Sequence, residues 1–97
     1  MFEGKKLLIT GGTGSLGSAL TKKILESDVD TIRIFSRDEL KQTQMNIKFS
    51  DDRLRFLIGD VRDKERLSRA LEDVDIVIHA AALNHVPVAE YNPFEAV

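Results

Sequence analysis

A short apolar run followed by three evenly spaced glycines constrains the fold of this chain more than any other sequence feature. Residues 7–10 form a continuous rather than an alternating run, as in a strand that is covered on both faces. Gly11, Gly14 and Gly17 follow directly. From Leu16 onwards the apolar residues recur at helical spacing. A strand, a glycine turn and a helix in this order predict the first βα unit of a parallel sheet.

The remainder of the chain repeats this alternation of short apolar runs and longer amphipathic stretches. It predicts strands and helices in the order strand 32–35, helix 38–49, strand 54–58, helix 64–72 and strand 74–80. In the helix at 38–49, Leu40, Met45 and Phe49 are expected to face the sheet. A further helix is expected to begin near Pro93. The expected fold class is therefore α/β: a parallel sheet of four strands with helices on both faces.

Composition excludes several classes of protein. The 97 residues suffice for one domain at most. Fourteen basic against sixteen acidic residues give a net charge of −2, without the basic excess of a general nucleic-acid binder. The chain has no cysteine, which excludes a disulfide scaffold, a zinc finger and a thiol nucleophile. No apolar run approaches the ~20 residues that cross a bilayer, and no signal peptide opens the chain. We therefore expect a soluble cytoplasmic protein with no nucleic-acid or membrane partner.

The glycine loop has the spacing G-x-x-G-x-x-G, which suits a loop that holds a pyrophosphate. The first glycine permits a tight turn, the second a close approach of phosphate to backbone, and the third close packing of the helix. The N–H groups and the dipole at the start of the helix favour an anion. An ordinary turn is the alternative, but the strand–turn–helix context favours dinucleotide binding. The candidate residues are Gly11, Gly12, Thr13, Gly14, Ser15, Leu16 and Gly17.

The end of the second predicted strand indicates which dinucleotide is bound. NAD-binding chains usually present an acidic residue about 20 residues after the glycines, where it holds the ribose 2′-hydroxyl. Here Ser36 and Arg37 come first. Arg37 can bind a 2′-phosphate through two N–H groups, and Lys41 lies one helical turn further on. These residues favour NADP over NAD. The alternative is that Arg37 pairs with Asp38 or Glu39 on a solvated face.

Two further positions fall at the same edge of the predicted sheet. Asp60 follows the third strand, where its carboxylate can accept from the exocyclic amine of an adenine. Capping of the next helix is an equal alternative. Ala80, Ala81 and Ala82 end the fourth strand and are small enough for a cofactor to lie across them. Simple packing against a neighbouring helix would explain these alanines equally.

Four segments of the chain carry a resemblance to a known family. They are "LLITGGTGSLGSAL", "IRIFSRDELKQTQM", "RFLIGDVRDKERLSRAL" and "VDIVIHAAALNHVPVAEYNPFEAV". Together they resemble the amino-terminal part of the extended short-chain dehydrogenases/reductases, and within that superfamily the inverting UDP-N-acetylglucosamine 4,6-dehydratases and related capsular-polysaccharide enzymes. The resemblance implies a Rossmann fold that holds NADP tightly, here truncated to a Rossmann-type parallel sheet of four strands in the order 3-2-1-4 with helices on both faces. It implies an enzyme that oxidises a UDP-sugar at C4, eliminates water across C5 and C6, and returns the hydride at C6.

The resemblance also implies roles for individual residues. Cofactor contacts are expected from residues 12–15 at the pyrophosphate and from 36–41 at the adenosine phosphate. They are also expected from Asp60 and Val61 at the adenine and from Ala80 near the ribose. Relatives commonly carry a lysine in the loop after "AAAL". This chain has Asn84 there, which is the only substrate-binding candidate and departs from the family pattern.

The residues that perform catalysis in this superfamily are not found in the sequence. Many short-chain dehydrogenases use a Tyr-x-x-x-Lys pair, but the only tyrosine, Tyr91, is followed four residues later by Glu95. His79 is interpreted as a core residue of its strand, and His85 lies in the next loop; the two do not form a metal site. No catalytic residue is therefore assigned. The resemblance implies that the acid/base groups and the sugar-binding domain lie beyond Val97.

Residues 1–97 are accordingly expected to be the NADP-binding portion of a longer enzyme and inactive by themselves. One alternative keeps the fold but makes the parent a nucleotide-sugar epimerase or reductase. Another is a non-catalytic half-domain that associates with itself. An exposed apolar edge on the fourth strand invites pairing with a second copy, so a homo-oligomer is expected.

Overall fold

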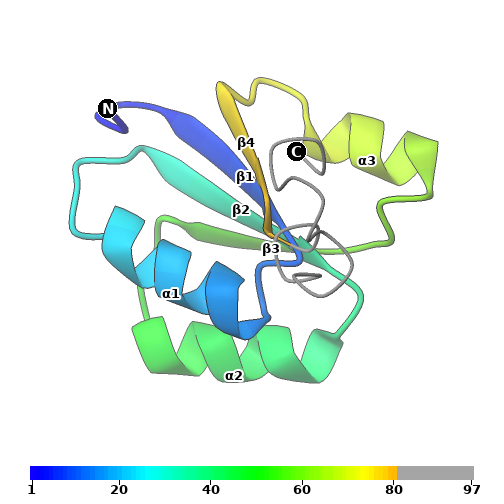
Figure 1. The fold of residues 1–97 in the computed structure, drawn as a ribbon, viewed down its shortest axis with the longest axis horizontal. Coiled ribbons are helices and arrows are strands. Elements are labelled where there is room, and N and C mark those ends of the chain that lie inside the picture. Colours follow the sequence, from blue (N-terminus) through cyan, green and yellow to red (C-terminus); the bar gives the residue numbers. More distant parts are fainter. Residues whose placement is uncertain (81–97) are drawn as a thin grey trace, which may run out of the picture.

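The computed structural model describes residues 1–80, in which helices pack on both faces of a four-stranded parallel sheet (Figure 1). In chain order the elements are β1 (Lys6–Thr10), α1 (Ser15–Ile24), β2 (Thr31–Ser36), α2 (Glu39–Phe49), β3 (Leu54–Ile58), α3 (Lys64–Ala70) and β4 (Ile76–His79). Helices α1 and α2 cover one face of the sheet, and α3 covers the other. The predictions at Ala81, Ala82, Asn84, His85 and Tyr91, and the helix expected near Pro93, lie outside the described residues.

The strand order is β3-β2-β1-β4, which confirms the expected 3-2-1-4 sheet. All three strand pairs are parallel, and Thr10 at the end of β1 is paired with Phe35 of β2 and His79 of β4. The order reverses direction beside β1, because β2 lies on one side of it and β4 on the other. In open α/β sheets ligands bind outside the carboxyl ends of the strands at such a reversal. The topology therefore predicts a ligand-binding site at the loop after β1.

The core explains why the first apolar run does not alternate. Successive side chains of a strand point to opposite faces, and both faces of this sheet are covered. Leu7 and Ile9 lie in the cluster beneath α1 and α2, which also contains Ile32, Ile34 and Met45. Leu8, Phe35 and Ala70 form the cluster beneath α3. Leu7, Leu8 and Ile9 are each 0% exposed, so every position of the run is used for packing.

Helix α2 corrects one sequence prediction. Leu40 was expected to face the sheet, but its side chain is 67% exposed, and Gln42 is buried together with Met45 instead. The helix begins after Asp38, whose side chain accepts a hydrogen bond from the backbone N–H of Lys41 at 3.0 Å. With Gln42 and Met45 on the inner side of the helix, Leu40 lies on the solvent side.

The cap of α3 corrects a second interpretation. Asp63, not Asp60, caps this helix by accepting from the backbone N–H of Arg66 at 3.2 Å. Asp60 therefore has another role at the end of β3. Within residues 1–80, no helix combines the length and the hydrophobicity needed to cross a bilayer.

Candidate functional site

An open groove of about 1120 Å³ lies at the carboxyl ends of β1, β2 and β3. Its size is comparable to that of small-molecule and cofactor sites. Three consecutive βα connections line it, each at the sheet edge where ligands bind in open α/β folds. The lining residues are Gly11, Thr13, Gly14, Phe35, Ser36, Arg37, Asp38, Glu39, Lys41, Gly59, Asp60, Val61 and Arg62.

The groove brings together most of the residues singled out in the sequence. Candidates from the glycine loop, from the end of β2 and from the end of β3 all contribute to one surface. Five candidates within the described part of the chain are not lining residues: Gly12, Ser15, Leu16, Gly17 and Ala80. Ala80 is fully buried in the core beneath α1 and α2, as the packing interpretation expects. His79 contacts the Thr10 hydroxyl through Nδ1, since the two are paired neighbours on β4 and β1.

The turn after β1 depends on glycine at its first position. Gly11 has φ +67°, in the left-handed region that favours glycine, and its N–H donates to the carbonyl of Phe35 at 2.8 Å. Gly14 is the N-cap of α1 and provides no side-chain acceptor for the N–H groups of the first turn. No acidic residue lies in that turn. Among residues 1–80, the start of α1 is therefore left with free donors and an uncompensated dipole, which suits an anion.

Gly17 brings α1 into direct contact with the glycine loop. A Cβ atom at Gly17 would lie 2.5 Å from the Cα atom of Gly12, and a Cβ atom at Gly12 would lie 2.8 Å from a side-chain carbon of Ile34. The third glycine was expected to pack the helix on the strand; the contact it makes is with the backbone of the loop. Gly12 and Gly17 thus lie beneath the groove and shape it without lining it.

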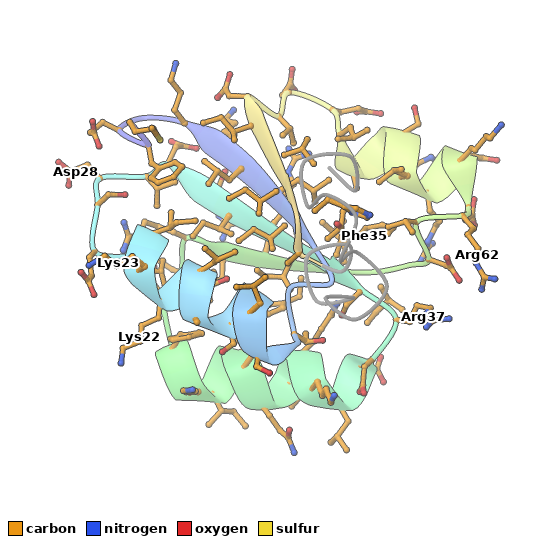
Figure 2. The ribbon with its side chains drawn as sticks, in the orientation of Figure 1. Lys22, Lys23, Asp28, Phe35, Arg37 and Arg62 are labelled. Atoms are coloured by element: carbon orange, nitrogen blue, oxygen red, sulfur yellow. The ribbon has the colours of Figure 1, made fainter. Side chains whose placement is uncertain are left out.

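Ser36 and Arg37 lie at the end of β2 and differ in exposure. Ser36 is 8% exposed, whereas the Arg37 side chain is 74% exposed and projects from the end of the sheet (Figure 2). Arg37 does not pair with Asp38 or Glu39; its Nη1 lies 3.6 Å from Oδ2 of Asp60 on the neighbouring connection. An exposed pair of this kind contributes only about 0–1 kcal/mol, so the guanidinium can turn to a stronger anion at little cost.

Asp60 is held by a residue that the sequence reasoning missed. Arg62 donates to it from its backbone N–H at 2.9 Å, from Nε at 3.1 Å and from Nη2 at 2.7 Å. These hydrogen bonds, and then the positive charges of Arg62 and Arg37, hold the pKa of Asp60 far below its usual range. The carboxylate therefore stays ionised at the edge of the groove, with both of its oxygens accepting from Arg62. The sequence feature that could have indicated Arg62 is its position two residues after Asp60, where an aspartate in a turn accepts from the backbone N–H.

This arrangement predicts an unusually acidic carboxyl group at Asp60. The Asp60 carboxyl resonance, followed by NMR as pH is lowered, is expected to titrate well below the ordinary value of about 3.9. Because the folded pKa is lowered, the stability that this group contributes is present above about pH 4 and is lost as pH falls toward the folded pKa. Arg62→Ala is expected to raise the midpoint, and Arg69→Ala to leave it unchanged. An ordinary midpoint in the unsubstituted protein would contradict the prediction.

Phe35 and Gly59 are two further lining residues that the sequence did not indicate. Phe35 belongs to the core beneath α3 and is only 2% exposed, yet it lines the groove. A Cβ atom at Gly59 would lie 2.5 Å from the ring carbon Cζ of Phe35. Gly59 thus lets the aromatic ring reach the floor of the groove. In the sequence, Phe35 has the pattern of an ordinary strand residue and Gly59 that of an ordinary turn glycine. Their contact appears only in the folded structure.

Comparison with known proteins gives consistent matches. A sequence model of the family described as polysaccharide biosynthesis protein matches residues 7–97. A UDP-N-acetylglucosamine 4,6-dehydratase (inverting) of Campylobacter jejuni is 61% identical over 98 residues, which cover 100% of this chain and 29% of that protein. A UDP-glucose 4-epimerase of Rickettsia canadensis is 50% identical over 101 residues, covering 100% of this chain and 30% of that protein. The chain spans about three-tenths of these curated relatives.

Solved structures share the fold. The X-ray structure of Pen from Bacillus thuringiensis matches with a TM-score of 0.82 and 43% identity, over 100% of this chain and 30% of that one. A UDP-glucuronic acid 4-epimerase from Bacillus cereus, solved with NAD, matches with a TM-score of 0.63 and 26% identity, over 76% of this chain and 26% of that one. A short-chain dehydrogenase/reductase from Veillonella parvula, solved with NADP, has a TM-score of 0.64 and 22% identity, over 77% of this chain and 34% of that one. Proteins of this fold thus bind NAD in one case and NADP in another.

Proposed function

This chain belongs to the polysaccharide biosynthesis protein family, and from that premise we propose that it is the NADP-binding portion of a nucleotide-sugar 4,6-dehydratase. The observation that carries the proposal is the groove in which the glycine turn, the N-cap Gly14 of α1 and the Ser36–Arg37 pair meet. Identity of 61% to a UDP-N-acetylglucosamine 4,6-dehydratase supports the choice of reaction. Because the chain spans 29% of that relative, the activity and the UDP-sugar substrate are proposals for the longer protein.

The residues of the groove fit each part of NADP. The free N–H groups at the start of α1 suit the pyrophosphate, because they find no side-chain acceptor at the cap. Arg37 and Ser36 suit the 2′-phosphate, with a mobile cation and a hydroxyl beside it. Asp60 suits the adenine, because its ionised carboxylate can exchange one of its hydrogen bonds from Arg62 for one from the exocyclic amine. Lys41 and Val61 line the same groove and complete the candidate contacts.

These contacts indicate which part of the reaction this portion of the enzyme serves. NADP held in this groove would supply the hydride acceptor for oxidation of the sugar at C4 and the hydride donor for reduction at C6. The residues of this chain hold the adenosine half of the cofactor and keep it oriented at the strand ends. We propose that the acid/base groups and the sugar-binding part of the enzyme lie beyond Val97. Self-association of the chain and a cytoplasmic location stay predictions.

Calorimetric titration with NADP and with NAD tests the cofactor assignment. We expect NADP to bind more tightly than NAD, because the site places a cation and a donor where the 2′-phosphate lies. A matched titration with 2′-phosphate-free and 2′-phosphorylated ADP-ribose separates the phosphate contribution from that of the nicotinamide. Binding of neither dinucleotide, or a preference for NAD, would overturn the assignment.

A turnover assay tests the reaction. With UDP-N-acetylglucosamine, the 97-residue chain is expected to form no 4-keto-6-deoxy product, whereas the full-length protein is expected to form it. A second candidate reaction is 4-epimerisation, favoured by the 50% identity to UDP-glucose 4-epimerases. The product distinguishes the two, because an epimerase returns a sugar that keeps its 6-hydroxyl. An epimer as the sole product would replace the dehydratase proposal with this alternative.

A further inference from the structure

Gln42 is a buried polar residue beside the groove. It lies on α2, is 5% exposed and faces the ends of β2 and β3 rather than solvent. Its Nε2 donates to the backbone carbonyl of Leu57 at 2.9 Å and to the hydroxyl oxygen of Ser36 at 3.0 Å. A backbone carbonyl can only accept, so Leu57 determines which end of the amide points toward the sheet. The two hydrogens of the amide nitrogen are thereby both used.

The orientation of Gln42 determines what the Ser36 hydroxyl can do. Because Gln42 can only donate to it, the Ser36 oxygen must accept, and its single proton has to point elsewhere. Ser36 lines the groove, and no acceptor within residues 1–80 takes that proton. The hydroxyl is therefore held as a donor available to the groove. Gln42 is not a lining residue, and Ser36 is the lining residue whose side chain it contacts.

We propose that Gln42 is a positioning residue that selects a phosphate over a hydroxyl at the ribose 2′ position. The inference rests on the proposed function, because it concerns the same cofactor site. A phosphate oxygen accepts only and carries charge, so a fixed donor beside it forms a charge-assisted hydrogen bond. NAD sites instead hold the 2′-hydroxyl through a carboxylate that accepts. With one lone pair of Ser36 occupied by Gln42, the hydroxyl is poorly suited to replace that carboxylate.

The substitution Gln42→Met in the protein at its natural full length tests the inference. Methionine keeps the length and the buried volume of the side chain but removes the donor, so the Ser36 hydroxyl is free to rotate. We expect the affinity for NADP to fall by about 3- to 10-fold, the worth of one well-placed hydrogen bond, with NAD affinity unchanged. Gln44→Met is the matched control: Gln44 is exposed on the same helix, and both affinities should stay at their original values.

A double-mutant cycle separates positioning from general damage to the fold. Ser36→Ala alone is expected to lower NADP affinity without changing NAD affinity, and adding Gln42→Met to it is expected to cost little more. Fully additive losses, or an equal loss for NAD and NADP, would overturn the inference. Ser36→Ala keeps the inference testable if Gln42→Met fails to fold. An unchanged ratio of NADP affinity to NAD affinity in Ser36→Ala refutes the proposal by itself.

The outcome also separates this inference from the proposed function. If the unsubstituted protein shows no preference for NADP, the proposed cofactor is wrong and the inference falls with it. If the preference is present and survives in Gln42→Met, the cofactor assignment stands and only the role of Gln42 is refuted.

Discussion

The substitution Gly17→Ala is expected to destabilise the protein by about 2 kcal/mol and to weaken NADP and NAD binding together. The added Cβ atom would lie 2.5 Å from Cα, and 2.6 Å from the carbonyl carbon and oxygen, of Gly12. Since all three are backbone atoms, the helix and the loop have to separate, and such overpacking costs roughly 1–3 kcal/mol. The separation also displaces the N–H groups at the start of α1, which a phosphate requires in place to within about 0.5 Å.

The sign of the stability change in Gly17→Ala is informative, because helix propensity alone predicts that alanine stabilises the protein. Alanine is favoured over glycine by about 1 kcal/mol in a helix interior. Urea denaturation measures the change in the free energy of unfolding, and calorimetry measures the two affinities. Ser18→Ala, at the next position of the same helix, removes an atom instead of adding one and should leave binding intact. A stabilised Gly17→Ala protein with unchanged affinities would refute the close contact between α1 and the loop.

Arg37→Ala is expected to lower the affinity for NADP at least about tenfold and to leave the affinity for NAD nearly unchanged. A hydrogen bond to a charged group contributes about 1.5–3 kcal/mol, which corresponds to roughly 10- to 150-fold in affinity. The side chain is 74% exposed, so solvent screening places the expected loss toward the lower end. The effect is specific to NADP because the 2′-phosphate is the only group that distinguishes it from NAD. Calorimetric titrations at low and at high salt measure both affinities.

Arg69→Ala is a closely matched control for this experiment. Arg69 is 76% exposed and lies 3.5 Å from Glu65, whereas Arg37 is 74% exposed and lies 3.6 Å from Asp60. The two changes therefore remove the same charge from arginines of similar exposure, although Asp60 is 28% and Glu65 82% exposed, and only Arg37 lines the groove. Equal losses of NADP affinity in both variants would show that net charge, not the position of Arg37, governs binding. An unchanged affinity in Arg37→Ala would remove the basis for the preference over NAD.

Sequence reasoning succeeded where one element carries its own pattern. The continuous run at β1 predicts a strand buried on both faces, and Leu7, Leu8 and Ile9 are all fully buried. The glycine spacing predicts the turn, and Gly11 has the positive φ that such a turn requires. It failed at α2, where Leu40 is exposed and Gln42 is buried. A hydrophobicity pattern assigns glutamine to the surface. It contains no information on the Leu57 carbonyl and the Ser36 hydroxyl, which bind the Gln42 amide in the fold.

The sequence by itself determined the elements and the glycine turn, because periodicity and glycine spacing are short-range properties, and its family resemblance implied the order of the strands. Only the tertiary structure decided the partners within the groove. It paired Arg37 with Asp60, and Gln42 with Leu57, across separate connections of the chain. Parallel register brings the carboxyl ends of β2 and β3 side by side. Contacts between side chains on different strands depend on this register, and no local pattern in the sequence encodes them.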